Sequence, residues 1–204
     1  MILDASSLEP RQRYRLLIST VTPRPIAWVS TRGTDGSHNL APFSFFQALS
    51  GTPPYIMISI GQRKGALKDT KRNIEATGEF VINMVSDEMA EQMNMTSGEY
   101  TADVDEFTVA HLTPVQADLV NVPRVAECLV SMEAKYVQSI ALPGSEYTII
   151  LGEILRWHIA DGLLAPDGLL DLNKIRPVAR LARDEYTRFG EVFAMPRPPA
   201  DFRG

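Results

Sequence analysis

The chain has 204 residues, a length that predicts one domain. Its composition of 45% hydrophobic and 22% charged residues is typical of a soluble globular protein and excludes disorder or fibrous repeats over most of the chain. A net charge of −5 provides no overall positive field for a phosphate backbone, so we expect no nucleic acid partner.

The N-terminal residues and the cysteine content indicate a reduced cytoplasmic location. Residues 1–17 carry charged side chains at Asp4, Glu9 and three arginines, without the apolar stretch of a signal peptide. No apolar run approaches the ~20 residues of a membrane span, so we expect no membrane partner. The single cysteine, Cys128, can form neither an internal disulfide nor a cysteine-based zinc site.

Both ends of the chain are predicted to be peripheral. Residues 1–20 form an N-terminal extension, in which 9–18 can make a helical turn or two. Residues 191–204 form a proline-rich C-terminal tail, and from Met195 onward they are typical of an extended arm. The region between them, 21–190, shows no repeat or linker and is predicted as one domain.

Strand signals dominate the first half of that domain. Residues 26–31 are rich in strand-forming side chains, and Asp35-Gly36 predicts a tight turn into a return strand over about 38–42. Further strands are predicted over 55–60 and 80–85.

Two short helices are predicted beside these strands. The first covers 66–76 and stops at Gly78, which is a suitable C-terminal cap. The second covers 86–95, with Ser86 or Asp87 at its N-cap.

The clearest periodicity lies over 125–136 and predicts a strand with one buried face. The two faces are Ala126, Cys128, Val130, Met132, Ala134 and Tyr136 on the apolar side, and Glu127, Ser131, Glu133 and Lys135 on the polar side. Residues 147–159 are apolar on both faces, which predicts a central strand. Many strands with few short helices favour an all-β barrel over a βαβ sheet.

Side-chain catalysis has little support in the sequence. We expect Cys128 to be an inert packing residue, because its strand face is apolar. His38, His111 and His158 lack metal-binding spacing, so no metal site is expected. No Gly-x-Ser-x-Gly, Gly-x-Gly-x-x-Gly or Walker A pattern occurs. Any chemistry is therefore expected to come from a bound cofactor.

One candidate cofactor segment is His38 to Phe46. It leaves a strand at Pro42 and places Ser44 among three phenylalanines. Such a segment can present main-chain N–H and C=O groups to a flat heteroaromatic ligand whose face is covered by rings. The alternative is a strand end whose aromatic side chains plug the barrel.

A second candidate segment is Ser59 to Thr70, followed by Lys71 and Arg72, and it suits a small phosphate. Basic side chains and glycines gather here beside the start of a helix and the hydroxyl of Thr70. The alternative is a solvated helix face. Taken together, a ring site and a phosphate site one strand apart describe a mononucleotide cofactor. The basic residues and glycines are Gly61, Arg63, Lys64, Gly65, Lys68, Lys71 and Arg72.

Several motifs in this order resemble the flavin reductase-like family. They cover about residues 22–186, nearly the whole domain. The matching segments are Thr22-Pro-Arg-Pro-Ile-Ala-Trp-Val-Ser-Thr31, Asn39-Leu-Ala-Pro-Phe-Ser-Phe-Phe46, Lys68-Asp-Thr70, Gly78-Glu-Phe-Val-Ile-Asn83, Leu151-Gly-Glu-Ile154, and Arg176-Pro-Val-Ala-Arg-Leu181 followed by Tyr186.

The resemblance implies an antiparallel Greek-key split β-barrel that binds FMN near the interface of a homodimer. By position, the segment 39–46 would contact the isoalloxazine edge, largely through its main chain. Asp69 would cap the helix or orient Lys68. The residues that the resemblance implies are Asn39, Leu40, Ala41, Ser44, Phe45 and Phe46 at the ring edge, Arg24, Trp28 and Thr31 on the flanking strand, Ser59, Lys64, Lys68 and Thr70 around the phosphate, and Tyr186 as a cover for the flavin.

The implied activity is electron transfer from NADH or NADPH through FMN to free flavin or another small acceptor. No side-chain acid or base is obligatory for hydride transfer to a flavin, so no catalytic residue is assigned. Many family members carry Gly-Asp-His before the Gly-Glu strand, whereas residues 141–148 here contain no histidine. The chain therefore looks more like the flavoredoxin-type branch with Lys-Asp-Thr.

Two other functions remain open at this point. One is a non-enzymatic electron carrier with a protein redox partner. The other is a barrel that binds no FMN. The electron donor, the final acceptor and any partner monooxygenase are not determined by the residues.

Overall fold

The structure is a computed structural model that describes residues 1–198. Its main element is a seven-stranded antiparallel sheet in the order β3-β2-β6-β9-β10-β5-β4. The strands are β2 (Ala27–Arg32), β3 (His38–Phe43), β4 (Phe46–Gly51), β5 (Pro54–Ile60), β6 (Glu79–Met84), β9 (Val130–Ala141) and β10 (Thr148–Ile159).

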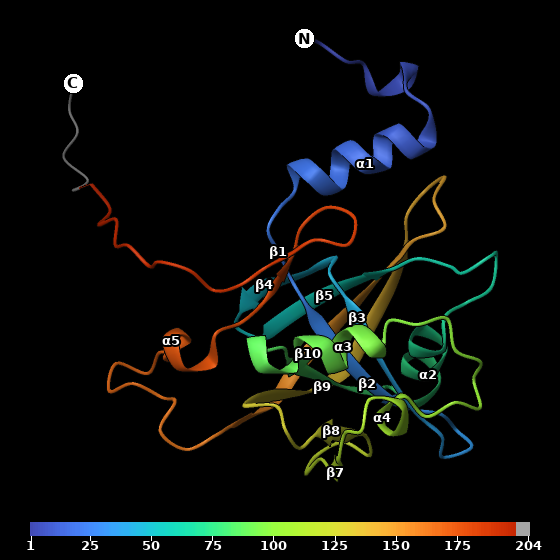
Figure 1. Ribbon diagram of the computed structural model, residues 1–204. Coiled ribbons are helices and arrows are strands. Elements are labelled where there is room, and N and C mark those ends of the chain that lie inside the picture. The colour runs from blue at the N-terminus through green and yellow to red at the C-terminus, as the bar shows by residue number, and fades with distance from the viewer. Residues whose placement is uncertain (199–204) are drawn as a thin grey trace.

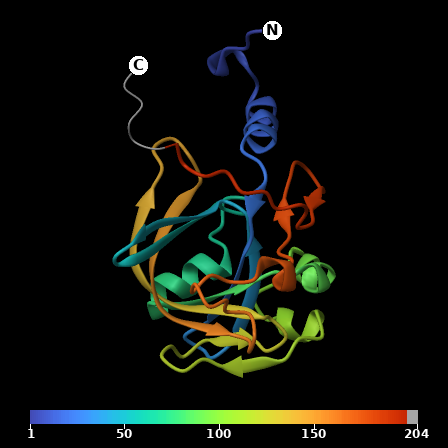
Figure 2. The same cartoon turned by 90° about the vertical axis from the view of Figure 1, so that its left-hand side faces the viewer.

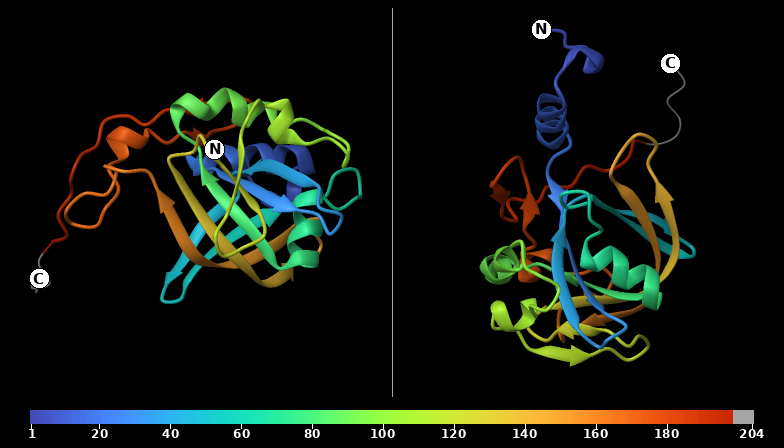
Figure 3. Two further views of the ribbon diagram at one scale, coloured as in Figure 1. Left: turned by 90° about the horizontal axis from the view of Figure 1, so that it is seen from below. Right: turned by 90° about the vertical axis from the view of Figure 1, so that its right-hand side faces the viewer.

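The sheet must curl into a barrel because of one short connection. β3 and β4 stand at opposite ends of the strand order, yet only Ser44 and Phe45 separate them in the chain. The Phe45 carbonyl accepts the Ser59 N–H at 2.8 Å, which ties this corner to β5. Figure 3 shows the strands curving around a common interior. The fold is the expected split barrel.

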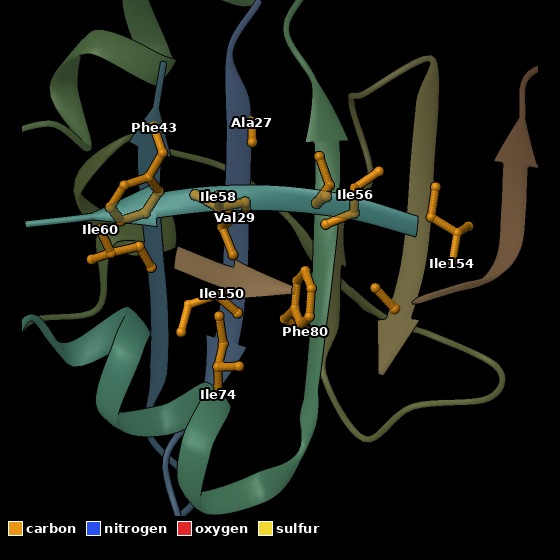
Figure 4. Close-up of a cluster of buried hydrophobic side chains, with 12 residues drawn as sticks. Ala27, Val29, Phe43, Ile56, Ile58, Ile60, Ile74, Phe80, Ile150 and Ile154 are labelled. Atoms are coloured by element: carbon orange, nitrogen blue, oxygen red, sulfur yellow. The ribbon is translucent and has the colours of Figure 1, made fainter. Parts of the chain in front are cut away.

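Isoleucine and phenylalanine side chains fill the barrel interior (Figure 4). Helix α2 (Asp69–Thr77) contributes Ile74, which points from the helix toward Ile150. At Gly152 of β10, an added Cβ would lie 2.3 Å from the Phe80 ring, so the close packing of this ring requires glycine. Burial of these apolar side chains supplies most of the free energy of folding.

The remaining elements are short and lie around the barrel. β7 and β8 form a two-stranded ribbon, and β1, β11 and β12 form a small sheet. Their bounds are η1 (Ala5–Ser7), α1 (Pro10–Thr20), β1 (Arg24–Pro25), η2 (Asp87–Met89), α3 (Ala90–Met95), α4 (Glu106–Val109), β7 (Pro114–Gln116), β8 (Pro123–Val125), α5 (Leu172–Ile175), β11 (Ala179–Arg180) and β12 (Tyr186–Thr187).

Both terminal segments extend away from the barrel (Figures 1 and 2). α1 is longer than the predicted turn or two, and Ile18 is its only buried residue. Residues 191–198 are exposed and form no regular secondary structure, while 199–204 of the predicted tail lie outside the described residues. None of the described helices is long and apolar enough to cross a membrane.

Most predicted elements are present with shifted ends. The helix predicted from residue 66 begins at Asp69, and Gly78 caps it with φ 77° in the left-handed region. The segment 86–95 forms a 3-10 turn followed by α3, and Ser86 precedes it without a side-chain cap hydrogen bond. The predicted central strand is β10, which lies between β9 and β5. β4 was not predicted.

The strand predicted over 125–136 differs most from the structure. β9 begins only at Val130, and Cys128 lies in the preceding turn rather than on a strand face. The predicted exposed face is also wrong, because Ser131 and Glu133 are 1% and 0% exposed. Burial raises the pKa of the Cys128 thiol to about 12, so it stays protonated and unreactive at neutral pH.

A second layer covers that polar face. The loop between β7 and β8 packs over β9, and Glu133 accepts the N–H groups of Asp118, Leu119 and Val120 at 3.0, 2.6 and 3.0 Å. His158 lies 2.5 Å from the same carboxylate. The alternation of polar side chains in β9 therefore reflects internal hydrogen bonding rather than contact with water.

Replacing this carboxylate should be costly. We expect Glu133→Gln to lower the free energy of unfolding by about 2–4 kcal/mol at pH 7, because a side-chain amide cannot accept all of these hydrogen bonds. Urea unfolding followed by circular dichroism measures it. Glu153→Gln, which breaks only a partly exposed pair with Lys135, is the matched control and should cost under about 0.5 kcal/mol.

The same pair of variants gives a pH test. Burial alone would raise the pKa of Glu133, but the hydrogen bonds from His158 and the loop outweigh it and hold the pKa below its usual value. This stabilisation is complete above the unfolded-state pKa of about 4.3 and is lost as the pH falls through the lower folded value. The difference between wild type and Glu133→Gln should therefore shrink below about pH 4; a constant difference would contradict this assignment.

Candidate functional site

Three adjoining cavities lie along the β3–β4 corner. The Glu106 cavity, about 130 Å³, lies between β3, the loop before α2 and the segments 96–100 and 106. The Tyr186 cavity, about 380 Å³, shares Pro42, Lys68 and Ser97 with it. The Phe45 cavity, about 490 Å³, shares Arg24 and Ser44 with the Tyr186 cavity. The Tyr186 cavity therefore lies between the other two and shares wall residues with each.

Lys68 and Arg63 bring positive charge to the Glu106 cavity. Lys68 stands immediately before α2, and its ammonium lies 5.3 Å from the centre of the Phe43 ring. Arg63 donates to the main-chain carbonyls of Tyr100 and Gly98 at 3.3 and 3.4 Å. Neither side chain forms an ion pair with a carboxylate within residues 1–198.

This arrangement is electrostatically unfavourable without an anion. Burial, followed by the neighbouring Arg63, lowers the pKa of Lys68 from its ordinary value. Asp69 does not compensate the two cations directly, because its carboxylate pairs with Arg72 of its own helix at 2.6 Å. Asp69 was predicted to cap the helix or to orient Lys68, and Lys68 itself occupies the N-cap position. The cavity is therefore suited to a small anion such as a phosphate.

Arg24 joins the peripheral elements at the Tyr186 and Phe45 cavities. Its guanidinium donates to the carbonyls of Ile18 and Val21, and to that of Leu181, each at 2.7 Å. It also donates to the Ser44 hydroxyl at 3.4 Å. A planar guanidinium can satisfy these acceptors together, so the end of α1 and the β11–β12 ribbon are held at the corner of the barrel.

The Tyr186 and Phe45 cavities differ in character. Tyr186 lies on β12, and Arg180 stacks over its ring with 4.4 Å to the ring centre while donating to its hydroxyl. The Phe45 cavity is lined mainly by apolar side chains, among them Phe45, Phe46 and Met57. Together they offer polar and apolar walls to a ligand larger than a phosphate.

Several predicted site residues line these cavities. Asn39, Ala41, Lys68 and Asp69 line the Glu106 cavity. The others on cavity walls are Arg24, Ser44 and Tyr186 in the Tyr186 cavity and Phe45, Phe46 and Ser59 in the Phe45 cavity.

Five predicted residues line none of the three cavities. Trp28 is fully buried and donates its indole N–H to Thr96 at 2.9 Å. The hydroxyl oxygens of Thr31 and Thr70 both accept from the Asn39 amide, at 3.3 and 2.9 Å, behind the cavity wall. The Leu40 side chain is buried. Lys64 is 85% exposed and pairs with Glu99 at 3.3 Å.

Two charged residues that line the Glu106 cavity, Arg63 and Glu106, lie outside the predicted set. Arg63 belongs to the predicted basic segment, but the sequence alone could not show which of the adjacent basic residues Arg63 and Lys64 would line the cavity. Glu106 had no sequence signal. It is 8% exposed, its carboxylate accepts the Leu40 N–H at 3.1 Å, and burial raises its pKa to about 6.

The curled sheet and its corner cavities define a split-barrel protein, and the comparisons give its family. Residues 19–178 match the family described as flavin reductase like domain. The chain belongs to this family, which supports flavin binding.

Known proteins cover almost the whole chain. An uncharacterized protein of Halalkalibacterium halodurans is 39% identical over 97% of both chains. The structure of nitrilotriacetate monooxygenase component B from Bacillus cereus superposes with a TM-score of 0.92 and 29% identity, covering 96% of this chain and 98% of that chain. The flavoredoxin of Desulfovibrio vulgaris (Miyazaki F) gives a TM-score of 0.75 and 29% identity, covering 86% and 91%.

The role of Arg24 can be tested without any ligand. Arg24→Lys should release α1 and the β11–β12 ribbon, because one ammonium cannot satisfy the same set of carbonyls. We expect amide hydrogen exchange in residues 10–21 and 179–187 to become at least ~10-fold faster, which corresponds to about 1.4 kcal/mol. Arg32→Lys, at an exposed contact with Asn121, is the control. Unchanged exchange in Arg24→Lys would refute the clamp.

Proposed function

We propose that the chain is an FMN-dependent oxidoreductase of the flavin reductase type. It would take electrons from NADH or NADPH and pass them through bound FMN to free flavin or another small acceptor. The observation that carries the proposal is a pair of cations, Lys68 and Arg63, that form no ion pair within residues 1–198 and line a small cavity beside larger ones with aromatic walls. This arrangement fits a mononucleotide with a phosphate and a flat ring.

The phosphate end is proposed to lie in the Glu106 cavity. Lys68 and Arg63 would provide charge-assisted hydrogen bonds, and the start of α2 would add unpaired N–H groups. Thr70 and Thr31 would act indirectly by holding the Asn39 amide at the cavity wall. We assign Lys64 no contact, because its side chain points into solvent and pairs with Glu99.

The ring end is proposed to lie at the β3–β4 corner. Main-chain groups from Ala41 to Phe46, with the Ser44 hydroxyl, would orient the isoalloxazine edge. Phe45 and Phe46 would exclude water beside it, and Ser59 would lie at the far wall. Arg24 would add positive charge near the ring, and Tyr186 would cover it from β12.

Bound FMN would supply the hydride- and electron-accepting chemistry. The protein groups would bind, orient and shield it, and no side-chain acid or base is assigned to hydride transfer. Trp28 would act only from the core behind the site, since it is fully buried.

A second candidate is an electron-transfer protein that resembles flavoredoxin. The observation in its favour is the turn between β9 and β10. Residues 142–147 of this turn include no histidine, whereas many reductases of the family have one there. The overlap with a flavoredoxin structure also supports it. Such a protein would hold FMN tightly and exchange electrons with a protein partner.

We further propose that the protein is a cytoplasmic homodimer with FMN near the interface. Exposed apolar side chains beside the Phe45 cavity, Leu17 and Val21, provide surface for a second copy. The tail from Met195 would lie across that copy. A single-subunit mass in sedimentation, for the purified chain, would contradict the dimer.

Three alanine variants test the phosphate end. We expect Lys68→Ala and Arg63→Ala each to weaken FMN binding by about 10–100-fold, since a charge-assisted hydrogen bond contributes roughly 1.5–3 kcal/mol. Lys64→Ala, one residue away, should change the Kd by less than about 3-fold, because an exposed pair contributes little. Quenching of FMN fluorescence measures all three; equal losses at Lys64 and Arg63 would refute the geometry.

An anaerobic absorption spectrum separates the two candidate functions. Bands near ~450 and ~375 nm that bleach at once on addition of NADH or NADPH would support the reductase. A yellow protein that stays oxidised with either nucleotide would favour the electron carrier. A colourless protein that takes up no added FMN would exclude both.

A further inference from the structure

Glu106 is a buried carboxyl group at the wall of the Glu106 cavity that the proposed chemistry leaves without a role. It stands at the start of α4, and one of its oxygens accepts the Leu40 N–H at 3.1 Å. The same carboxyl lines a small second cavity with His38 and Arg72. It forms no ion pair within the described part of the chain.

The neighbouring elements carry both signs of charge but none pairs with Glu106. Asp105 precedes it on the chain and lies 3.7 Å from His38. The charged and titratable side chains that line its two cavities from other elements are Arg63, Lys68, Asp69, Arg72, Tyr100 and His38. Asp69 and Arg72 satisfy each other at 2.6 Å. Among the described residues, Glu106 therefore lines the cavity without an ion pair, and backbone N–H groups are its hydrogen-bond donors.

This environment makes the neutral acid easier to form than it is for an ordinary glutamate. Burial raises the pKa of Glu106 to about 6, and the nearby carboxylates of Asp105 and Asp69 act in the same direction, against the hydrogen bond from Leu40. A phosphate dianion placed between Lys68 and Arg63 would repel an ionised Glu106 across a poorly solvated space. A protonated Glu106 would instead offer the phosphate an O–H donor.

We propose that Glu106 is a cofactor-binding residue that contacts the FMN phosphate in its protonated form, so that the chain takes up a proton when it binds FMN. The inference rests on the proposed placement of the phosphate in the Glu106 cavity. One oxygen keeps the Leu40 N–H, which fixes the start of the segment 40–46, and the other carries the proton toward the phosphate. Glu106 thus links the phosphate end of the site to the main chain at the ring end.

The linkage has a definite sign. The free protein must protonate Glu106 to bind, so above about pH 6 affinity falls by up to ~10-fold per pH unit until the pH reaches the higher pKa of the bound state. The phosphate itself works in the opposite direction. Its own second pKa near ~6 makes it a better anion as the pH rises.

The test is FMN binding by wild type and Glu106→Gln, with Kd measured by fluorescence between pH 6.0 and 8.0. The variant keeps an acceptor for the Leu40 N–H but cannot change charge. We expect the wild-type Kd to rise at least ~5-fold across this range and the Kd of Glu106→Gln to stay within about 2-fold. Riboflavin, which lacks the phosphate, should show no such rise with either protein. Glu99→Gln, on an exposed carboxyl of the neighbouring loop, should behave as wild type.

Each other outcome overturns the proposal. An equal rise in Glu106→Gln would assign the pH dependence to another group. A flat wild-type profile would exclude proton uptake while leaving FMN binding intact. Absence of FMN binding by the wild type at every pH would refute the proposed function together with this inference.

A second measurement needs no variant and covers the case in which Glu106→Gln fails to fold. Calorimetric titration of wild type at pH 7 in buffers of different ionisation enthalpy gives the number of protons exchanged. We expect an uptake of roughly 0.5–0.9 proton with FMN and none with riboflavin. Zero uptake, or release, with FMN would overturn the proposal.

Discussion

The two-residue connection between β3 and β4 is the constraint on which the rest of the structure depends. Strands at opposite ends of the sheet order can be joined by Ser44 and Phe45 only if the sheet closes on itself. The backbone turns sharply at this corner, where the Phe45 carbonyl stays paired with the Ser59 N–H of β5. Ser44 lines both the Tyr186 and the Phe45 cavity, so these two cavities meet at the corner. The proposed main-chain contacts with a flat ligand would therefore lie where this short connection closes the barrel.

Two buried glutamates show how local hydrogen bonding sets the pKa of a carboxyl group. Glu133 accepts three loop N–H groups and contacts His158, and its pKa lies below the usual value despite full burial. Glu106 accepts one N–H from Leu40, and its pKa is raised to about 6. The first glutamate is a structural anchor for the β7–β8 loop. The second retains the capacity to gain a proton, which is useful only where a ligand can respond to it.

The sequence predicted the strands of the barrel well because hydrophobic periodicity reports burial directly. It failed at Ser131 and Glu133, because a strand pattern cannot reveal that a second layer supplies N–H donors to its polar face. Within the basic loop, Lys64 has φ 50° and Gly65 φ 78°, a left-handed pair that reverses the chain. This turn sends Lys64 outward and leaves Arg63 at the cavity. Residue type and spacing alone could not separate these neighbours, and they gave no indication of Glu106, which arrives from a distant segment.

The contacts of Arg24 suggest different roles for the barrel and for the peripheral elements in the proposed site. The proposed phosphate end is built from β3, the loop before α2 and the start of α4. The proposed ring end would be completed by α1 and the β11–β12 ribbon, which Arg24 joins to each other through main-chain carbonyls. Substitutions in these peripheral elements can reshape the Tyr186 cavity without disturbing the hydrogen bonds that hold the barrel. Under the proposed function, the barrel would therefore retain the cofactor, while the segments that Arg24 holds against it would set the choice of electron donor or acceptor.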